Sequence, residues 1–208
     1  MSPSEPDAAP GLRERKRLQT LDLLTRSAYT LFETHGYDGV TMEQIAAQAG
    51  VSKGTLYNHF PVKEALLAHY FHQELARSAR DLLPRLMKLP GFAQRLTKTL
   101  HASAHWSEAH RAYMAPYLHY RLATAQPAAQ DDARYPRSGM HTLFAALIES
   151  GQAAGELRTD LSAAQLAQHL QLLYLGALTR WLADPRASLK REFDAVVSLF
   201  TQGAGSPA

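Results

Sequence analysis

A short stretch of the chain, residues 53–59, gathers polar side chains of the kinds that bind nucleic acid. They are an ammonium, two hydroxyls, an amide and an imidazole, carried by Lys53, Thr55, Tyr57, Asn58 and His59. A threonine methyl group can touch thymine, and an asparagine can pair with adenine through two hydrogen bonds. We therefore predict that this stretch contacts DNA, with Thr55 and Asn58 as the base readers.

The residues before this stretch predict two short helices joined by a tight turn. Thr41 is a good N-cap, and Gln44 three residues later completes a capping box. Gly50 supplies the permissive backbone that a three-residue turn needs. Ser52 then caps the second helix. Residues 41–60 are therefore predicted to form a helix-turn-helix.

Two apolar residues give the second helix a buried side. Leu56 and Phe60 are four residues apart, so both point into a core. The polar groups are left on the other sides, where the helix would enter a DNA major groove. The alternative is an ordinary solvated helix face. We favour DNA contact because caps, turn and polar face all agree with this docking geometry.

The same stretch resembles a known family. From residue 41 it reads Thr-x-x-x-Ile-Ala-x-x-Ala-Gly-Val-Ser-x-Gly-Thr-Leu-Tyr-x-His-Phe, followed by Lys63 and Leu66. This resembles the signature of TetR-type (tetracycline-repressor-type) transcriptional regulators. The match runs from about Leu21 to Leu67, and beyond it only the layout of helices is similar. The resemblance implies that five of these side chains bond phosphates: Thr41, Lys53, Tyr57, His59 and Lys63.

Basic residues also cluster before the first predicted helix. Arg13, Arg15, Lys16 and Arg17 lie together, although residues 1–60 are not basic as a whole. Positive charge at a helix start is unfavourable for the helix dipole, so a nearby anion is a reason for it. We predict phosphate or minor-groove contact, the alternative being a solvated helix start. The predicted DNA-binding set is Arg13, Arg15, Arg17, Thr41, Ser52, Lys53, Thr55, Tyr57, Asn58, His59 and Lys63.

Composition narrows the class of protein. The chain has 208 residues, is 46% hydrophobic, has a formal net charge of +3 and contains no cysteine. Disulfides, thiolate metal sites and cysteine nucleophiles are therefore excluded. No apolar run is long enough to cross a bilayer, and the N-terminus does not read as a signal peptide, so we expect a cytoplasmic protein.

The catalytic and metal signatures that we looked for are missing from the sequence. There is no Gly-rich phosphate loop, no G-x-S-x-G elbow and no convincing acid pair. Among ten histidines, His101 and His105 lie four apart, but no third ligand has convincing spacing. We predict no enzyme, no cofactor and no metal site.

Helical periodicity continues along the whole chain. We expect an all-α protein of about nine helices, with a three-helix helix-turn-helix domain followed by a helical bundle for dimerisation and effector binding. The predicted segments are a disordered tail at 1–11, the DNA-binding domain at 12–60, the bundle at 61–203 and a tail at 204–208.

Several residues predict where the helices begin and end. Pro61 suits the first turn of a helix that runs to about Leu83, and Pro84 should stop or kink it. Ser107 is a candidate helix cap, and Pro116 should bend or split its helix. Residues 126–139 read as a loop.

The last two predicted helices, near 162–183 and 188–203, carry more apolar side chains than one buried face requires. The TetR-type resemblance implies that they pair with a second subunit as a four-helix bundle. A short recognition helix also needs a second half-site for useful affinity. We predict a homodimer on an inverted-repeat operator, with an interface formed by Leu172, Gly176, Leu189, Phe193, Val196, Val197 and Phe200.

Residues 101–144 are rich in groups that line pockets. Tyr113, Tyr117 and Tyr120 share one helical face, and three tyrosines are costlier to bury than three phenylalanines. We predict that they hold a mainly apolar or aromatic effector against helix 61–83, although each alone could be core. The predicted set is His101, His105, Trp106, Tyr113, Met114, Tyr117, Tyr120, Arg121 and Phe144. The protein would then be a repressor that the effector releases; the alternative is a DNA-binding protein without a small-molecule effector, controlled by a protein partner or acting architecturally.

Overall fold

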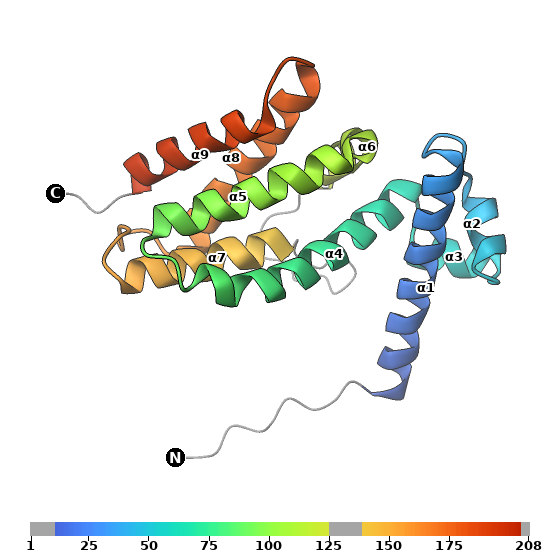
Figure 1. Ribbon diagram of the computed structural model, residues 1–208. Helices are drawn as coiled ribbons and strands as arrows, with labels where there is room; N and C mark the ends of the chain where they lie inside the picture. Colours follow the sequence, from blue (N-terminus) through green and yellow to red (C-terminus); the bar gives the residue numbers. More distant parts are fainter. Residues whose placement is uncertain (1–10, 125–138, 205–208) are drawn as a thin grey trace, which may run out of the picture. The chain divides into compact units, whose positions relative to one another are not determined.

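The computed structural model describes residues 11–124 and 139–204, and within these ranges the chain forms nine α-helices, as expected for an all-α fold. They are α1 (Leu12–His35), α2 (Met42–Gln48), α3 (Lys53–His59), α4 (Lys63–Leu86), α5 (Phe92–Ala109), α6 (Arg111–Ala123), α7 (Gly139–Ala153), α8 (Ala163–Ala183) and α9 (Leu189–Ala204). Figure 1 shows their order along the chain. None of the described helices is both long and apolar enough to span a membrane.

The chain divides into two compact units between Tyr70 and Phe71, inside α4. The first unit consists of α1, α2, α3 and the beginning of α4 (Figure 1). Its core is apolar, and Leu24, Ile45 and Leu56 have no exposed surface. Three different helices supply these three residues, so the short helices are held by tertiary burial.

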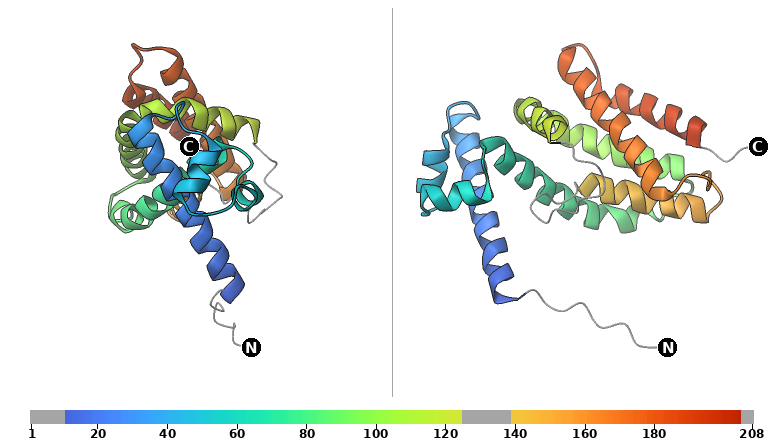
Figure 2. Two further views of the ribbon diagram at one scale, coloured as in Figure 1. Left: turned by 90° about the vertical axis from the view of Figure 1, so that its right-hand side faces the viewer. Right: turned by 180° about the vertical axis from the view of Figure 1, so that it is seen from behind.

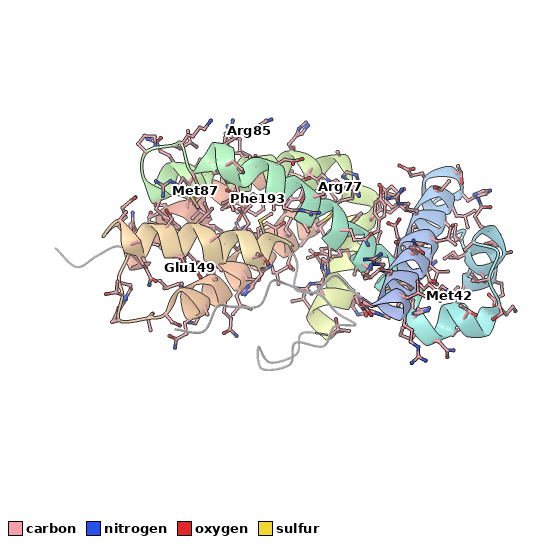
Figure 3. All side chains as sticks on the ribbon, turned by 90° about the horizontal axis from the view of Figure 1, so that it is seen from below. Met42, Arg77, Arg85, Met87, Glu149 and Phe193 are labelled. Carbon is pink, nitrogen blue, oxygen red and sulfur yellow. The ribbon has the colours of Figure 1, made fainter. Side chains whose placement is uncertain are left out.

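The second unit is a bundle built from the remainder of α4 and from α5 to α9. Helices α8 and α9 lie side by side, and α7 packs on α8 while α5 packs on α9 (Figures 1 and 2). Phe144 and Phe193 are fully buried in this bundle. Figure 3 shows Phe193 among the helices, whereas Arg77 and Arg85 on α4 lie at the surface.

One very close crossing fixes where α7 begins. A Cβ atom added to Gly139 would lie 2.5 Å from the backbone nitrogen of Ala76 in α4. Only a glycine permits the two backbones to approach so closely. Gly139 was expected to be the last residue of a loop over 126–139, and the rest of that predicted loop lies outside the described residues.

The predicted caps of the helix-turn-helix are confirmed. Thr41 and Gln44 form a capping box at the start of α2, and the Ser52 hydroxyl accepts from the backbone N–H of Thr55 at the start of α3. Gly50 adopts φ +66° in the turn between them. The helix-turn-helix is therefore built by the local residues from which it was predicted.

Two helix breaks that the sequence suggested in the second unit, at Ser107 and Pro116, are not found in the described helices. Ser107 does not cap a helix, because it lies fully buried inside α5; the break falls instead at His110. The His110 backbone N–H donates to the carbonyl oxygens of Trp106 and Ser107, which closes the last turn of α5. Pro116 does not split its helix but lies within α6, where its missing N–H removes a single backbone hydrogen bond.

Two predictions about α4 also need correction. Pro61 precedes α4, which begins at Lys63, and Pro84 lies inside the last turn. The helix continues past Pro84 to Leu86, and the missing N–H of the proline removes one backbone hydrogen bond.

Candidate functional site

Helix α3 presents polar side chains on a buried apolar base. Leu56 is fully buried and Phe60 is 4% exposed, so the inward side of the helix is anchored in the first unit. Lys53, Tyr57 and Asn58 are exposed, the tyrosine to 45%. The structure thus places the predicted DNA-contacting side chains on the outer side of a helix whose inner side is fixed.

Ser52 and Thr55 interact with each other at the start of α3. The Ser52 Oγ accepts from the Thr55 backbone N–H at 3.1 Å, and the two hydroxyl oxygens lie 2.9 Å apart. Both hydroxyls are therefore used within the cap. Thr55 keeps its methyl group for an apolar contact, which is the contact that thymine offers in the major groove.

Lys53 forms an ion pair across the helix-turn-helix. Its Nζ lies 3.2 Å from Oε1 of Glu43 in α2, and both side chains are about half exposed or more, at 65% and 48%. Exposed ion pairs contribute little to stability and are screened by salt. The ammonium can therefore exchange Glu43 for a phosphate at small cost, so the pair holds Lys53 near the expected DNA surface.

Thr41 and His59 lie at two other edges of the motif. The Thr41 backbone N–H donates to Oε1 of Gln44 at 2.8 Å, and its hydroxyl accepts from the Gln44 N–H, so Thr41 is exposed but ordered by the cap. His59 is partly buried at the end of α3.

Lys63 occupies a position that sequence reasoning did not anticipate. Its Nζ donates to the carbonyl oxygens of Tyr37 at 2.8 Å and Val40 at 3.2 Å, and lies 4.3 Å from the centre of the Tyr37 ring. The Tyr37 hydroxyl donates to Glu64 at 2.8 Å. Burial and the Glu64 carboxylate raise the pKa of Tyr37 well above its usual range, so the phenol stays protonated. We call Tyr37, Lys63 and Glu64 the turn clamp.

The turn clamp ties the connection between α1 and α2 to the first turn of α4. Val40, whose carbonyl Lys63 holds, directly precedes the N-cap of α2. The clamp therefore sets where the helix-turn-helix begins. Two of the three ammonium hydrogens of Lys63 are used in this way, so at most one remains for the phosphate contact that the family resemblance implies.

Replacing Lys63 by methionine should destabilise the first unit. Two charged hydrogen bonds are lost and two carbonyls are left unpaired, at a cost of about 1–3 kcal/mol. Urea denaturation of the variant measures the loss, with Lys53→Met as an exposed-lysine control that should change stability little. An unchanged free energy of unfolding for Lys63→Met would show that the clamp contributes nothing.

The three predicted arginines of α1 differ in their surroundings. The guanidinium of Arg17 makes two hydrogen bonds to Glu14, at 2.9 and 2.8 Å, and this pairing raises its pKa. Arg13 and Arg15 are exposed near the start of α1. A phosphate would therefore have to compete with Glu14 for Arg17.

His69 is a partly buried titratable group in the first unit. Its ring lies edge-on to Phe60, with centroids 5.5 Å apart, and its buried Nε2 has no hydrogen-bond partner within the described ranges. Burial lowers the pKa of His69 below 6.5, and Arg17 adds to the effect while Asp22 opposes it. The imidazole is therefore neutral when the unit is folded near pH 7.

Acid should destabilise the first unit through His69. Because the folded pKa lies below 6.5, the unfolded chain binds more protons as pH falls past 6.5. The free energy of unfolding should then fall by up to about 1.4 kcal/mol per pH unit until the folded pKa is reached. Urea melts between pH 7.5 and 5 measure this slope for the natural protein and for His69→Leu. Equal slopes in the two proteins would rule out His69 as the cause.

Comparison with known proteins shows which family the helix-turn-helix resembles. Residues 24–70 match the family model described as bacterial regulatory proteins, tetR family. The regulator TcmR of Streptomyces glaucescens is 47% identical over 55 residues, which are 26% of this chain and 24% of TcmR. The repressor AcnR of Corynebacterium jeikeium is 24% identical over 153 residues, covering 72% of this chain and 74% of AcnR.

Residues 24–70, the helix-turn-helix and its flanking helices, therefore match the TetR family. Among solved structures, the TetR-family repressor FadR of Thermus thermophilus, crystallised with lauroyl-CoA, has a TM-score of 0.76 and 26% identity, covering 90% of this chain and 98% of FadR. The chain spans only about a quarter of the length of TcmR, the relative with the higher identity. These relatives are regulators, which agrees with the prediction of a regulator and not an enzyme.

The residues predicted for the TetR-type dimer interface fall into two groups. Leu189 and Phe193 have no exposed surface and Phe200 is 5% exposed, so these side chains pack within their own chain. The Phe193 ring stacks on Tyr174 with centroids 5.3 Å apart. Val196 is also buried, at 5% exposed, and Val197 is partly buried.

The other group lies on an open apolar surface between α8 and α9. Leu172 is 59% exposed and Gly176 is exposed, and beside them Leu173 and Leu199, which were not predicted, are 37% and 63% exposed. They line a groove of about 260 Å³ together with Ala177, Arg180, Glu192, Ala195 and Val196. We call this surface the α8–α9 groove. The apolar periodicity of α8 and α9 does not distinguish these exposed leucines from the leucines of the core.

The residues predicted for the effector site are only partly brought together. Trp106, Tyr113 and Tyr117 converge on Phe71 of α4, with ring centroids 4.7, 6.4 and 5.3 Å away. His110, which was not predicted, joins them at 5.8 Å. Met114 and Phe144 are buried, while Tyr120 and Arg121 are partly buried.

The two predicted histidines lie apart from these rings. His105 is exposed, and Nε2 of His101 lies 2.6 Å from Oδ1 of Asp194 in α9. His101 lines a surface hollow of about 320 Å³ with Leu89, Ala93, Gln94, Thr97 and Lys98. Within the described ranges no group of three metal-ligating side chains is found.

Proposed function

We propose that this protein is a sequence-specific, homodimeric transcriptional repressor whose helix α3 reads operator DNA and which a small apolar or aromatic effector releases. The observation that carries the proposal is α3 itself, with Lys53, Tyr57 and Asn58 exposed over the buried Leu56. This is the geometry by which a recognition helix enters a major groove. Its match to the TetR family supports the same role.

Dimerisation follows from the length of α3 and from the α8–α9 groove. A helix of seven residues reads few base pairs, so useful affinity needs a second half-site. Exposed Leu172 and Leu199 offer an apolar surface that a second copy would cover. A symmetric dimer implies an inverted-repeat operator with half-site centres about 34–36 Å apart, or a multiple of that distance.

The effector is supported by relatives and by the second unit. The structurally similar FadR of Thermus thermophilus was crystallised with lauroyl-CoA, an apolar chain on a polar carrier. In this chain, the Tyr117 ring contacts Phe71, and its hydroxyl lies 3.2 Å from Nε2 of His72. The alternative function, the same repressor without a small-molecule effector, is favoured by Phe71, which already fills the space among those rings.

The decisive experiment is selection of bound duplexes from a random pool by the full-length protein. We expect an inverted repeat, which can then be located upstream of genes in the source genome. Recovery of no common sequence, with binding that depends on salt alone, would leave only non-specific DNA affinity.

Lys53 and Asn58 should affect binding in different ways. Lys53→Ala should weaken binding to every sequence and lower the salt slope by about 1, because one phosphate contact is lost. Asn58→Ala should cost about 1–3 kcal/mol at one base pair per half-site and relax the preference there. Fluorescence anisotropy with the selected operator and single-base variants measures both, with Lys98→Ala on α5 as an exposed control. Natural affinity, slope and preference in both variants would remove α3 as the reading helix.

A charge in the α8–α9 groove should dissociate the dimer. Leu172→Glu would bury an unpaired carboxylate against the second subunit, so the protein should sediment as a monomer at micromolar concentration. Leu122→Glu, at a leucine that is 51% exposed on α6, is the matched control. Phe193 is unsuitable for this test because it is fully buried in its own chain. The interface is misplaced if Leu172→Glu remains a dimer.

A further inference from the structure

Phe71 of α4 is enclosed by four aromatic rings of the second unit. Trp106, His110, Tyr113 and Tyr117 surround it, with centroids between 4.7 and 6.4 Å from its own. Each ring plane is turned 60° to 80° from that of Phe71, so the four present an edge-to-face enclosure. We call these four residues the aromatic box. Phe71 has no exposed surface within it.

The box has a polar corner with an unused donor. The Tyr117 hydroxyl lies 3.2 Å from Nε2 of His72. Arg121 follows Tyr117 by one helical turn, and its charge acts on the buried Tyr117 phenol. The Nε of Arg121 is buried and has no hydrogen-bond partner within the described part of the chain. A buried guanidinium N–H without an acceptor is a costly arrangement that a ligand oxygen would relieve.

Ring and corner together specify a kind of molecule. The box is shaped around a single six-membered ring, because that is what Phe71 places in it. A carboxylate or phenolate oxygen is the acceptor that a guanidinium N–H and a phenol O–H bind best. A one-ring aromatic acid would satisfy both requirements.

We propose that the aromatic box is the effector site, that Phe71 occupies it as an internal plug in the ligand-free protein, and that a one-ring aromatic acid binds by displacing Phe71 and placing its acidic group at Tyr117 and Arg121. This proposal rests on the proposed function for its regulatory meaning, but not for the binding event itself. The proposal explains how a ligand could bind in an interior that side chains already fill, because the ligand takes the place of Phe71.

Displacement of Phe71 has a direct consequence for α4. The preceding residue, Tyr70, stacks on Tyr29 of α1 with centroids 3.9 Å apart and planes 13° from parallel. Successive residues of one helix point about 100° apart, so a turn of α4 that withdraws Phe71 also moves Tyr70. Ligand binding in the second unit would therefore disturb a contact inside the first unit through one continuous helix.

Binding can be followed with a single tryptophan. The chain has two, and Trp181→Phe leaves Trp106 of the box as the reporter. Titration with benzoate should shift the Trp106 emission and raise the melting temperature. Cyclohexanecarboxylate, which has the same acid on a non-aromatic ring, should bind at least tenfold more weakly, and Arg121→Met should lose at least tenfold in benzoate affinity, with Arg80→Met as an exposed control.

The plug itself is tested by removing it. Phe71→Ala should bind benzoate at least tenfold more tightly than the Trp181→Phe parent, because no side chain must be displaced. Phe193→Ala is the matched control, since Phe193 is equally buried in the same unit but stacks on Tyr174 instead. If Phe71→Ala does not fold, Phe71→Leu provides the smaller opening, with a proportionally smaller gain over the parent.

The outcomes separate the two proposals. Benzoate binding to neither the parent nor a folded Phe71 variant would overturn the aromatic box as a ligand site, whereas operator binding by the same protein would still support the repressor. Equal gains in Phe71→Ala and Phe193→Ala would show that any cavity accepts the ring, and would also overturn the proposal. Benzoate binding that leaves operator affinity unchanged would uphold the site and remove its role in release.

Discussion

The burial of Leu56 and Phe60 is the constraint on which the helix-turn-helix unit depends. Helix α3 has seven residues, and a helix of this length is not stable alone in water. Its shape and direction therefore come from the core that receives these two side chains and from the Ser52 cap that begins it. This apolar contact therefore fixes the position of every polar group on the outer side of the helix. Under the proposed function, a change in the core of this unit would therefore alter DNA reading without changing any residue that faces DNA.

Helix α4 is the second constraint, because it belongs to both units. Its first turn carries Lys63 and Glu64 of the turn clamp, which hold the entry to α2. Two turns later Tyr70 stacks on Tyr29, and the next residue, Phe71, fills the aromatic box. A rotation of this helix would act on all of these contacts together, since they are fixed to one backbone. Coupling between ligand and DNA then needs a helix with two arrangements rather than a chain of separate contacts.

The sequence predicted the elements whose causes are local. Thr41 with Gln44, Gly50 and Ser52 each act on backbone within three residues, and each appears in the structure where the pattern indicated. Non-local contacts were not predictable in the same way. Lys63 looked like a phosphate ligand because its type and position resemble the family, but its carbonyl partners are 23 and 26 residues away. Ser107 looked like a cap because serine often is one, yet the buried side of α5 continues through it.

The proposed dimer surface shows most clearly that non-local packing is hard to predict from sequence. Helices α8 and α9 pack on each other and on α7 and α5, and in the proposed dimer each also offers a side to a second subunit. Apolar periodicity marks both kinds of side with the same residues, so Phe193 and Leu172 look equivalent in sequence. Burial in the single chain separates them, with Phe193 fully covered and Leu172 59% exposed. One side of α8 and α9 remains apolar and exposed after the chain has folded, so association can still bury it. This side is small, so a single charge placed on it should be enough to oppose association. Burial also separates the aromatic box from the rest of the core, because Tyr117 and Arg121 keep polar atoms in the interior. In the proposed effector site, this is where the fold would give up stability for recognition.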